Sequence, residues 1–188
     1  MRLFFAVTLP EELIARIAEV QDGLRRVVND EGVRWTRPEQ FHFTVKFLGE
    51  QKEEPVHKAI ECAQSLRDAW KPFEMTLGGI GAFPNIKRPS VLWAGTTSGG
   101  EVLTELGAAL DSALVREGFP REFKPVKAHL TLARIKSYAG EMAAANALKS
   151  SGAIEIGTAR IDGFVLMQSR LKPSGSEYTK VERFEFRE

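Results

Sequence analysis

A short pattern that occurs twice constrains the fold of this sequence more than any other feature. The segments Phe41–Val45 (FHFTV) and Ala128–Leu132 (AHLTL) each place a histidine two residues before a threonine, and the two histidines are 87 positions apart. The chain has only three histidines, so chance is a poor explanation for two such pairs. Residues i and i+2 of a β-strand point to the same face about 6.5 Å apart. Both segments therefore predict a strand with one histidine–threonine face and one apolar face, and the repetition predicts two related lobes.

The remaining apolar patterns predict an α+β protein. Apolar residues recur at helical spacing over residues 10–27, 55–70 and 101–117. Short apolar or alternating runs bounded by glycine and proline predict strands at residues 1–9, 33–35, 41–48, 73–80, 91–95, 128–135, 161–168 and 178–186. This order predicts helices that cover one face of mainly antiparallel sheets.

Composition narrows the class of protein. The 188 residues are 43% hydrophobic and 27% charged, which predicts one compact domain over residues 1–188. The 26 basic and 25 acidic residues nearly cancel, so any affinity for RNA must come from local clustering. The single cysteine, Cys62, excludes a disulfide scaffold and favours a reducing, cytoplasmic location. No apolar stretch approaches the roughly 20 residues that span a bilayer, and Met1–Leu9 has no cleavage pattern, so we expect no membrane association.

The repeated pair suits acid–base catalysis. Imidazole titrates near about pH 6.5, so one histidine can act as general base while a protonated partner acts as general acid. Hydroxyl groups can donate hydrogen bonds to oxygens that gain charge in the transition state. His42 and His129 with Thr44 and Thr131 therefore favour in-line displacement at phosphorus without a metal. His57, on an expected helix with no accompanying threonine, is interpreted as an ordinary surface residue.

Other chemistries have weaker support in the sequence. Two histidines can anchor zinc, but neither has a carboxylate or cysteine at ligand spacing. An adenylating ligase needs Lys-x-Asp-Gly, whereas residues 160–163 read Arg-Ile-Asp-Gly, and an arginine cannot serve as that nucleophile. No Gly-rich phosphate loop is present, and no elbow motif surrounds any serine.

The sequence resembles a known family, the two-histidine (2H) phosphoesterases, which are defined by paired His-x-Thr-x motifs. Within this superfamily it is most similar to the RNA 2′,3′-cyclic phosphodiesterases, also called 2′-5′ RNA ligases. The resemblance covers nearly the whole chain and is carried by Arg2–Val7 (RLFFAV), Trp35–Gly49 (WTRPEQFHFTVKFLG), His129–Arg134 (HLTLAR) and Gln168–Leu171 (QSRL), with Tyr178 beyond. The paired motifs are specific for the superfamily, and the flanking segments favour the RNA enzyme.

The resemblance implies a fold and a reaction. The fold is a single domain of two pseudo-symmetric lobes, each an antiparallel sheet backed by helices, with both motifs lining the cleft between them. The reaction opens a terminal ribose 2′,3′-cyclic phosphate with water to leave a 2′-phosphate, and it needs no metal or nucleotide cofactor. A 5′-hydroxyl in place of water would form a 2′-5′ linkage. The implied partner is RNA with a cyclic phosphate end, with tRNA halves as one candidate and no required protein partner.

The resemblance also assigns roles to individual residues. It makes His129 the base that activates water and His42 the acid that protonates the departing 3′-oxygen. It makes Thr44 and Thr131 the residues that hold the non-bridging phosphate oxygens. The two motifs are chemically equivalent on paper, so the choice of acid and base rests on the resemblance alone.

Basic and aromatic residues near the motifs are candidate substrate contacts. Lys46 shares strand parity with His42 and Thr44, which predicts a phosphate contact. Arg134 matches the family's arginine after the second motif, although simple alternation places it opposite His129 unless the strand ends or bulges. A positive rim could further include Arg34, Arg37, Lys124, Lys127, Arg170 and Lys172. Phe4, Phe5 and Phe43 are candidates for base stacking, but core packing is the expected role of each.

Two alternatives stay open at this stage. A phosphodiesterase of the same superfamily could act on a small cyclic nucleotide such as ADP-ribose 1″,2″-cyclic phosphate, and its cleft would reject long RNA. A non-catalytic RNA-binding module would keep the basic rim and tolerate loss of His42.

Overall fold

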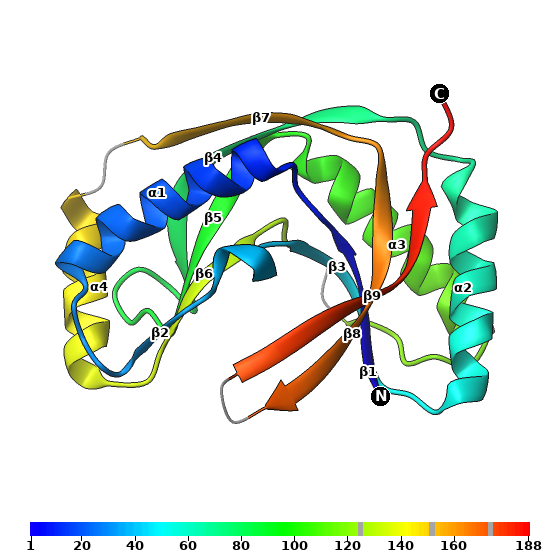
Figure 1. Ribbon diagram of the computed structural model, residues 1–188, viewed down its shortest axis with the longest axis horizontal. Coiled ribbons are helices and arrows are strands. Elements are labelled where there is room, and N and C mark those ends of the chain that lie inside the picture. The colour runs from blue at the N-terminus through cyan, green and yellow to red at the C-terminus, as the bar shows by residue number, and fades with distance from the viewer. Residues whose placement is uncertain (124–125, 151–152, 173–174) are drawn as a thin grey trace.

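The computed structural model of the chain describes residues 1–123, 126–150, 153–172 and 175–188. Nine strands in these residues form one curled antiparallel sheet with the order β7-β4-β5-β6-β3-β1-β8-β9, and β2 pairs with β6 (Figure 1). The four α-helices of the described residues form two contacting pairs, one on each half of this sheet. The expected α+β class is confirmed.

One half of the sheet contains the N-terminus of the chain and its last two strands. Its strands are β3 (Phe43–Glu50), β1 (Arg2–Val7), β8 (Gly163–Lys172) and β9 (Gly175–Glu185). Two helices pack on this half, α2 (Glu53–Arg67) against β9 and α3 (Gly100–Arg116) against β3.

The other half is built mainly from the middle of the chain. Its strands are β7 (Glu155–Ile161), β4 (Phe73–Phe83), β5 (Val91–Ser98), β6 (Leu130–Ile135) and the short β2 (Val33–Trp35). The helix α1 (Glu11–Val27) contacts β7 and α4 (Tyr138–Ser150). An apolar stripe that includes Leu13, Ile17 and Leu24 buries one face of α1, and acidic residues in its first turn and basic residues in its last turn complement the helix dipole.

The two halves meet at the strands that follow the motif histidines. Phe43 of β3 and Leu130 of β6 are the registered pair between these strands, and both side chains are fully buried. Beyond this pair β3 continues along β1, whereas β6 continues along β5 and β2. The repeated sequence pattern thus corresponds to a repeated position, one in each half.

The expected elements agree with most of the structure. All three expected helices and a strand in every expected run are confirmed, with shifted ends. The sequence did not predict α4. It predicted one strand at 161–168, where the structure has two, the end of β7 and most of β8. The buried face of α4 is mostly alanine and glycine, and Leu148 is its single large apolar side chain, which is too little to mark a helical stripe in the sequence. No helix in the described residues is long and apolar enough to cross a membrane.

Candidate active site

His42 lies immediately before β3 and is held by its own chain. Its Nδ1 donates a hydrogen bond to the carbonyl oxygen of Gln40 at 2.7 Å, and its Nε2 lies 3.1 Å from Oγ1 of Thr44. Two aromatic rings pack around the imidazole, Phe4 at 5.0 Å and Tyr178 at 5.2 Å between ring centroids. These contacts fix both the tilt of the ring and the atom that faces Thr44.

His129 occupies the corresponding position before β6. Its Nδ1 donates to the carbonyl oxygen of Lys127 at 2.6 Å, and the ring of Phe83 packs against it edge to face at 4.9 Å. In each motif, therefore, the backbone carbonyl two residues before the histidine accepts from Nδ1.

This shared contact determines the tautomer. A carbonyl oxygen can only accept, so Nδ1 carries a proton in both rings. The atom that gains or loses a proton is then Nε2 in His42 and in His129. One fold thus presents two imidazoles that both titrate at the same ring atom.

Burial and charge shift the pKa of both histidines in the same direction. Burial lowers the pKa of His42 below its ordinary value, and the nearby His129 adds to this, against the hydrogen bond to Gln40, which raises it. Burial also lowers the pKa of His129, and the positive charges of Arg134 and Lys127 reinforce this, again against a backbone hydrogen bond that raises it. Both shifts favour the neutral form of the imidazole.

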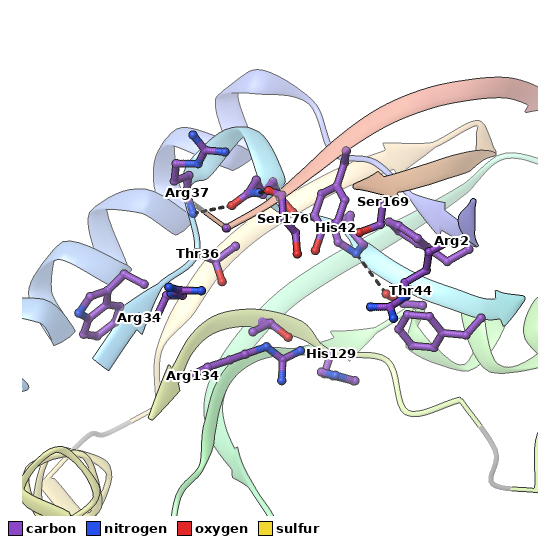
Figure 2. A pocket seen from close by; sticks show the side chains of 17 residues that line it. Arg2, Arg34, Thr36, Arg37, His42, Thr44, His129, Arg134, Ser169 and Ser176 are labelled. Carbon is purple, nitrogen blue, oxygen red and sulfur yellow. Dashed lines mark hydrogen bonds between the residues drawn. The ribbon is translucent and has the colours of Figure 1, made fainter. Parts of the chain in front are cut away.

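A pocket of about 440 Å³ brings the two motifs together (Figure 2). His42, Thr44, His129 and Thr131 all line it, as the strand geometry of the sequence predicts. The other lining residues are Arg2, Phe4, Arg34, Trp35, Thr36, Arg37, Gln40, Phe47, Arg134, Ser169, Gly175, Ser176 and Tyr178. The pocket therefore combines two titratable rings, several hydroxyls and an excess of arginine.

A β-bulge follows the threonine in each motif strand. One step along β1, from Phe5 to Ala6, spans two residues of β3, from Lys46 to Thr44. The same shift occurs in β6 opposite β5, where the partners of Leu92 and Trp93 are Ala133 and Thr131, two positions apart. An inserted residue reverses the alternation of side chains beyond it. In each strand, therefore, the side chains beyond the bulge point to the opposite face from the one that strict alternation predicts.

The bulges determine which of the later residues in each strand face the pocket. The fifth residue after each histidine, Phe47 in β3 and Arg134 in β6, lines the pocket. The fourth residue, Lys46 or Ala133, is buried on the opposite face. The strand bulges before Arg134, and this places Arg134 on the same face as His129.

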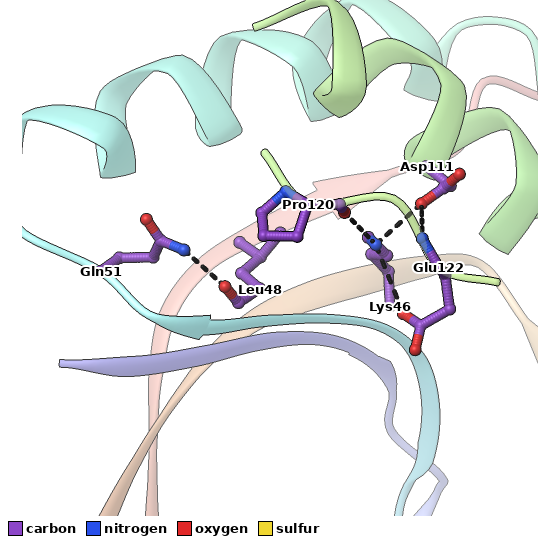
Figure 3. Close-up of polar contacts among 6 residues, drawn as sticks. All are labelled: Lys46, Leu48, Gln51, Asp111, Pro120 and Glu122. Atoms are coloured by element: carbon purple, nitrogen blue, oxygen red, sulfur yellow. Dashed lines mark hydrogen bonds and ion pairs between the residues drawn. The ribbon is translucent and has the colours of Figure 1, made fainter. Parts of the chain in front are cut away.

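The structure corrects the expectation for Lys46, which is not among the residues that line the pocket. The residue is 3% exposed, and its Nζ lies 2.8 Å from Asp111 Oδ1 and 3.3 Å from Glu122 Oε2 and donates to the carbonyl oxygen of Pro120 at 2.9 Å (Figure 3). Lys46 thereby ties the chain segment that leads toward His129 to the strand that follows His42. Its position is structural because every donor of the ammonium group is occupied by protein.

The other candidate contacts separate into two groups. Arg34, Arg37 and Phe4 line the pocket, whereas Lys127, Arg170 and Lys172 do not. Lys172 forms an ion pair with Glu177 at 2.7 Å, and Lys127 lies over the ring of Phe83. Phe5 and Phe43 are fully buried in the core, and Lys124 lies outside the described residues.

Sequence reasoning missed several residues that support the site. Gln40 contributes the carbonyl that holds His42, and its side-chain amide donates to the carbonyl oxygen of Ser176 on the β8–β9 hairpin. Phe47 and Arg2 also line the pocket without having been singled out. The sequence carries no signal for Gln40 and Lys127 in this role, because every residue has a backbone carbonyl and the two side chains differ. Among the described residues, no three His, Cys, Asp or Glu side chains are grouped so that they could hold a metal ion.

Comparison with known proteins identifies the family. The family described as LigT like Phosphoesterase matches residues 7–93 and 96–178. Similar proteins include the RNA 2′,3′-cyclic phosphodiesterase of Thermus thermophilus, 35% identical over 192 residues that cover 100% of this chain and 91% of that protein. The protein of the same name from Methanothermobacter thermautotrophicus is 32% identical over 186 residues, 98% of each chain. Among solved structures, the Thermus thermophilus protein TT0787 matches with a TM-score of 0.81 and 34% identity, covering 99% of this chain and 98% of that one. The chain belongs to the LigT-like phosphoesterase family.

Proposed function

We propose that this protein is a metal-independent phosphodiesterase that hydrolyses the terminal 2′,3′-cyclic phosphate of RNA to a 2′-phosphate. One observation carries the proposal: each half of the sheet supplies one histidine to the same pocket, and a backbone carbonyl fixes Nε2 as the titrating atom of both. The name RNA 2′,3′-cyclic phosphodiesterase that the related proteins carry supports the substrate.

The proposed reaction is an in-line displacement at phosphorus. Nε2 of His129 takes a proton from water, and the water oxygen bonds to phosphorus. The bond from phosphorus to O3′ breaks, and Nε2–H of His42 gives its proton to that oxygen. The product carries a 2′-phosphate and a 3′-hydroxyl, and the two histidines have exchanged protonation states.

Three further residues are proposed to hold the phosphate. The hydroxyls of Thr44 and Thr131 donate to the non-bridging oxygens, which gain charge in the transition state. Arg134 supplies the compensating positive charge from the bulged part of β6. A 5′-hydroxyl that replaces water would give a 2′-5′ linkage by the same proton transfers.

We propose that residues 1–188 work as one bilobal domain, because the acid and the base come from different halves. RNA ends with a cyclic phosphate are the proposed partner, and tRNA halves are one candidate source of such ends. The unpaired Cys62 favours the reducing cytoplasm as the location.

The test is hydrolysis of a short RNA that ends in a 2′,3′-cyclic phosphate, with EDTA present and with the 2′- and 3′-phosphate products resolved. We expect the 2′-phosphate alone, at a rate that EDTA does not change. A 3′-phosphate product would contradict the proposed leaving group, and inhibition by EDTA would contradict metal independence. No turnover of RNA together with turnover of ADP-ribose 1″,2″-cyclic phosphate would replace the proposed substrate.

A further inference from the structure

Two arginines face each other across neighbouring strands in the wall of the pocket. Arg34 of β2 is registered directly opposite Arg134 of β6, and both line the pocket. Side chains at such positions have Cβ atoms about 4.5 to 5.5 Å apart, and like charges there destabilise the sheet. A bound anion would relieve the repulsion between these two guanidinium groups.

The described residues supply no such anion to this pair. Arg2 and Arg37 also line the pocket, but they form ion pairs with Glu50 and Glu39, each at 3.4 Å. Neither Arg34 nor Arg134 forms an ion pair with a carboxylate of the described part of the chain. The two guanidinium groups together suit a ligand with more than one negative group.

The two arginines occupy different places relative to the reacting phosphate. Figure 2 shows Arg134 reaching toward His129, while Arg34 projects into the pocket from the neighbouring strand. The charge of Arg134 lowers the pKa of His129, in agreement with this proximity. Arg34 lies one strand further from the histidine, so it is placed for a second anion rather than for the phosphate that reacts.

The backbone that carries Arg34 is firmly held. Thr36 donates its N–H to the carbonyl oxygen of Leu132 at 2.8 Å. The side-chain amide of Gln21, which is 2% exposed, donates to the carbonyl oxygens of Thr36 and Leu132 at 2.8 and 2.9 Å. Arg34 is thus presented from a strand whose end is fixed to β6, which lowers the entropy lost when an anion binds.

We propose that Arg34 binds the phosphate attached to O5′ of the terminal nucleotide and makes it a determinant of substrate choice. The inference rests on the proposed function, since the second anion of RNA nearest the cyclic phosphate is the one on O5′ of the same ribose. A guanidinium group binds a phosphate through two parallel N–H donors, which gives direction as well as charge.

The test compares two substrates that differ by this one group: adenosine 2′,3′-cyclic phosphate and its 5′-phosphorylated form. For the unaltered protein we expect kcat/KM to be about 10- to 100-fold higher with the 5′-phosphate, the range for a hydrogen bond between charged groups. In Arg34→Gln the ratio of the two values falls to about one, and in Arg34→Lys it takes an intermediate value because the fork is lost. Arg26→Gln removes an exposed arginine from the last turn of α1 and keeps the original ratio.

Two results would overturn the assignment of Arg34. One is equal kcat/KM for the two substrates in the unaltered protein, and the other is a loss in Arg34→Gln that is the same for both. A short RNA that ends in a 2′,3′-cyclic phosphate is assayed beside the two nucleotides. If the unaltered protein hydrolyses neither the nucleotides nor this RNA, the proposed function itself fails; if it hydrolyses the RNA but gains nothing from the 5′-phosphate of the nucleotide, only the assignment of Arg34 fails. The melting temperature of each variant shows whether replacing Arg34, whose side chain is exposed, has destabilised the fold.

Discussion

Phe43 of β3 lies directly opposite Leu130 of β6, and each follows the histidine of its motif. The residues that flank this pair, His42 and Thr44 in one strand segment and His129 and Thr131 in the other, all line the pocket. A buried apolar contact thus sets the spacing of four polar side chains on the other face. The core and the reaction site are coupled through this one pair.

Phe43→Ala should therefore affect both stability and activity. The Phe43 side chain is fully buried, so its removal should cost about 3 to 5 kcal/mol of unfolding free energy. Phe47→Ala provides the control for stability, because that ring is 57% exposed and its loss should cost less than about 1 kcal/mol. Urea denaturation measures both, and equal costs would show that the junction is not a packed core.

The three histidines of the chain should differ in their effect on rate. His42→Ala and His129→Ala should each lower kcat by about 10² to 10⁴ without changing the melting temperature by more than a few degrees. His57→Ala, at an exposed position of α2, should keep full activity. Full activity of either motif variant in a steady-state assay would remove that residue from the mechanism.

The pH dependence of kcat/KM should be bell-shaped, with its maximum below pH 6.5, the ordinary pKa of an imidazole. The reaction needs one neutral and one protonated imidazole, and burial lowers the pKa of both below the ordinary value of 6.5. As pH rises through the pKa of the acid, its proton is lost, so the fall in kcat/KM should begin below pH 6.5. At low pH the base is protonated and the value falls again.

Bound phosphate should change this profile. An anion raises the pKa of both imidazoles, so kcat, which reports the complex, should peak at a higher pH than kcat/KM. Initial rates from about pH 4 to 9 in buffers of constant ionic strength provide the measurement. A flat profile with chemistry as the slow step would be incompatible with two titrating groups.

Lys46 should matter for stability rather than for binding phosphate. Lys46→Met leaves Asp111 and Glu122 without their cation and should cost about 2 to 4 kcal/mol. Lys58→Met removes the exposed ion pair with Glu117 and should cost at most about 1 kcal/mol. Equal losses in the two variants would contradict the buried role.

The contribution of Lys46 should disappear in acid. Burial would raise the pKa of Asp111, but hydrogen bonds from Lys46 and from the Glu122 N–H hold it below its ordinary value of 3.8. A carboxyl with a lowered pKa in the folded state stabilises above its unfolded pKa and loses this effect as pH falls through the folded value. The difference between the unaltered protein and Lys46→Met should therefore narrow below about pH 3.8 in denaturation curves.

The comparison of Lys46 with Arg134 shows what one sequence can and cannot predict. Period-two alternation placed His42 with Thr44 and His129 with Thr131 correctly, because no bulge lies between the members of either pair. Beyond the threonines it predicted the wrong face for Lys46 and left Arg134 undecided. A bulge depends on the register with the neighbouring strand, and that register involves residues far away in sequence.

Two missed elements have similar explanations. The buried residues of α4 are alanine and glycine except for Leu148, and small residues carry little of the periodic signal that large side chains give. In β7 the buried residues are Ile156, Ala159 and Ile161, so they do not follow a strict period of two. The alternation is broken near Gly157, which has φ 151°, where the pairing with β4 shifts register. Tertiary contacts, rather than local pattern, complete both elements.

The most direct test of the central claim separates the acid from the base. The substrate is an RNA end with a cyclic phosphate in which sulfur replaces O3′, so that the leaving thiolate needs no proton. We predict that this change restores most of the rate lost in His42→Ala and none of the rate lost in His129→Ala. Restoration in His129→Ala instead would exchange the two roles, and restoration in neither variant would contradict acid–base catalysis by this pair.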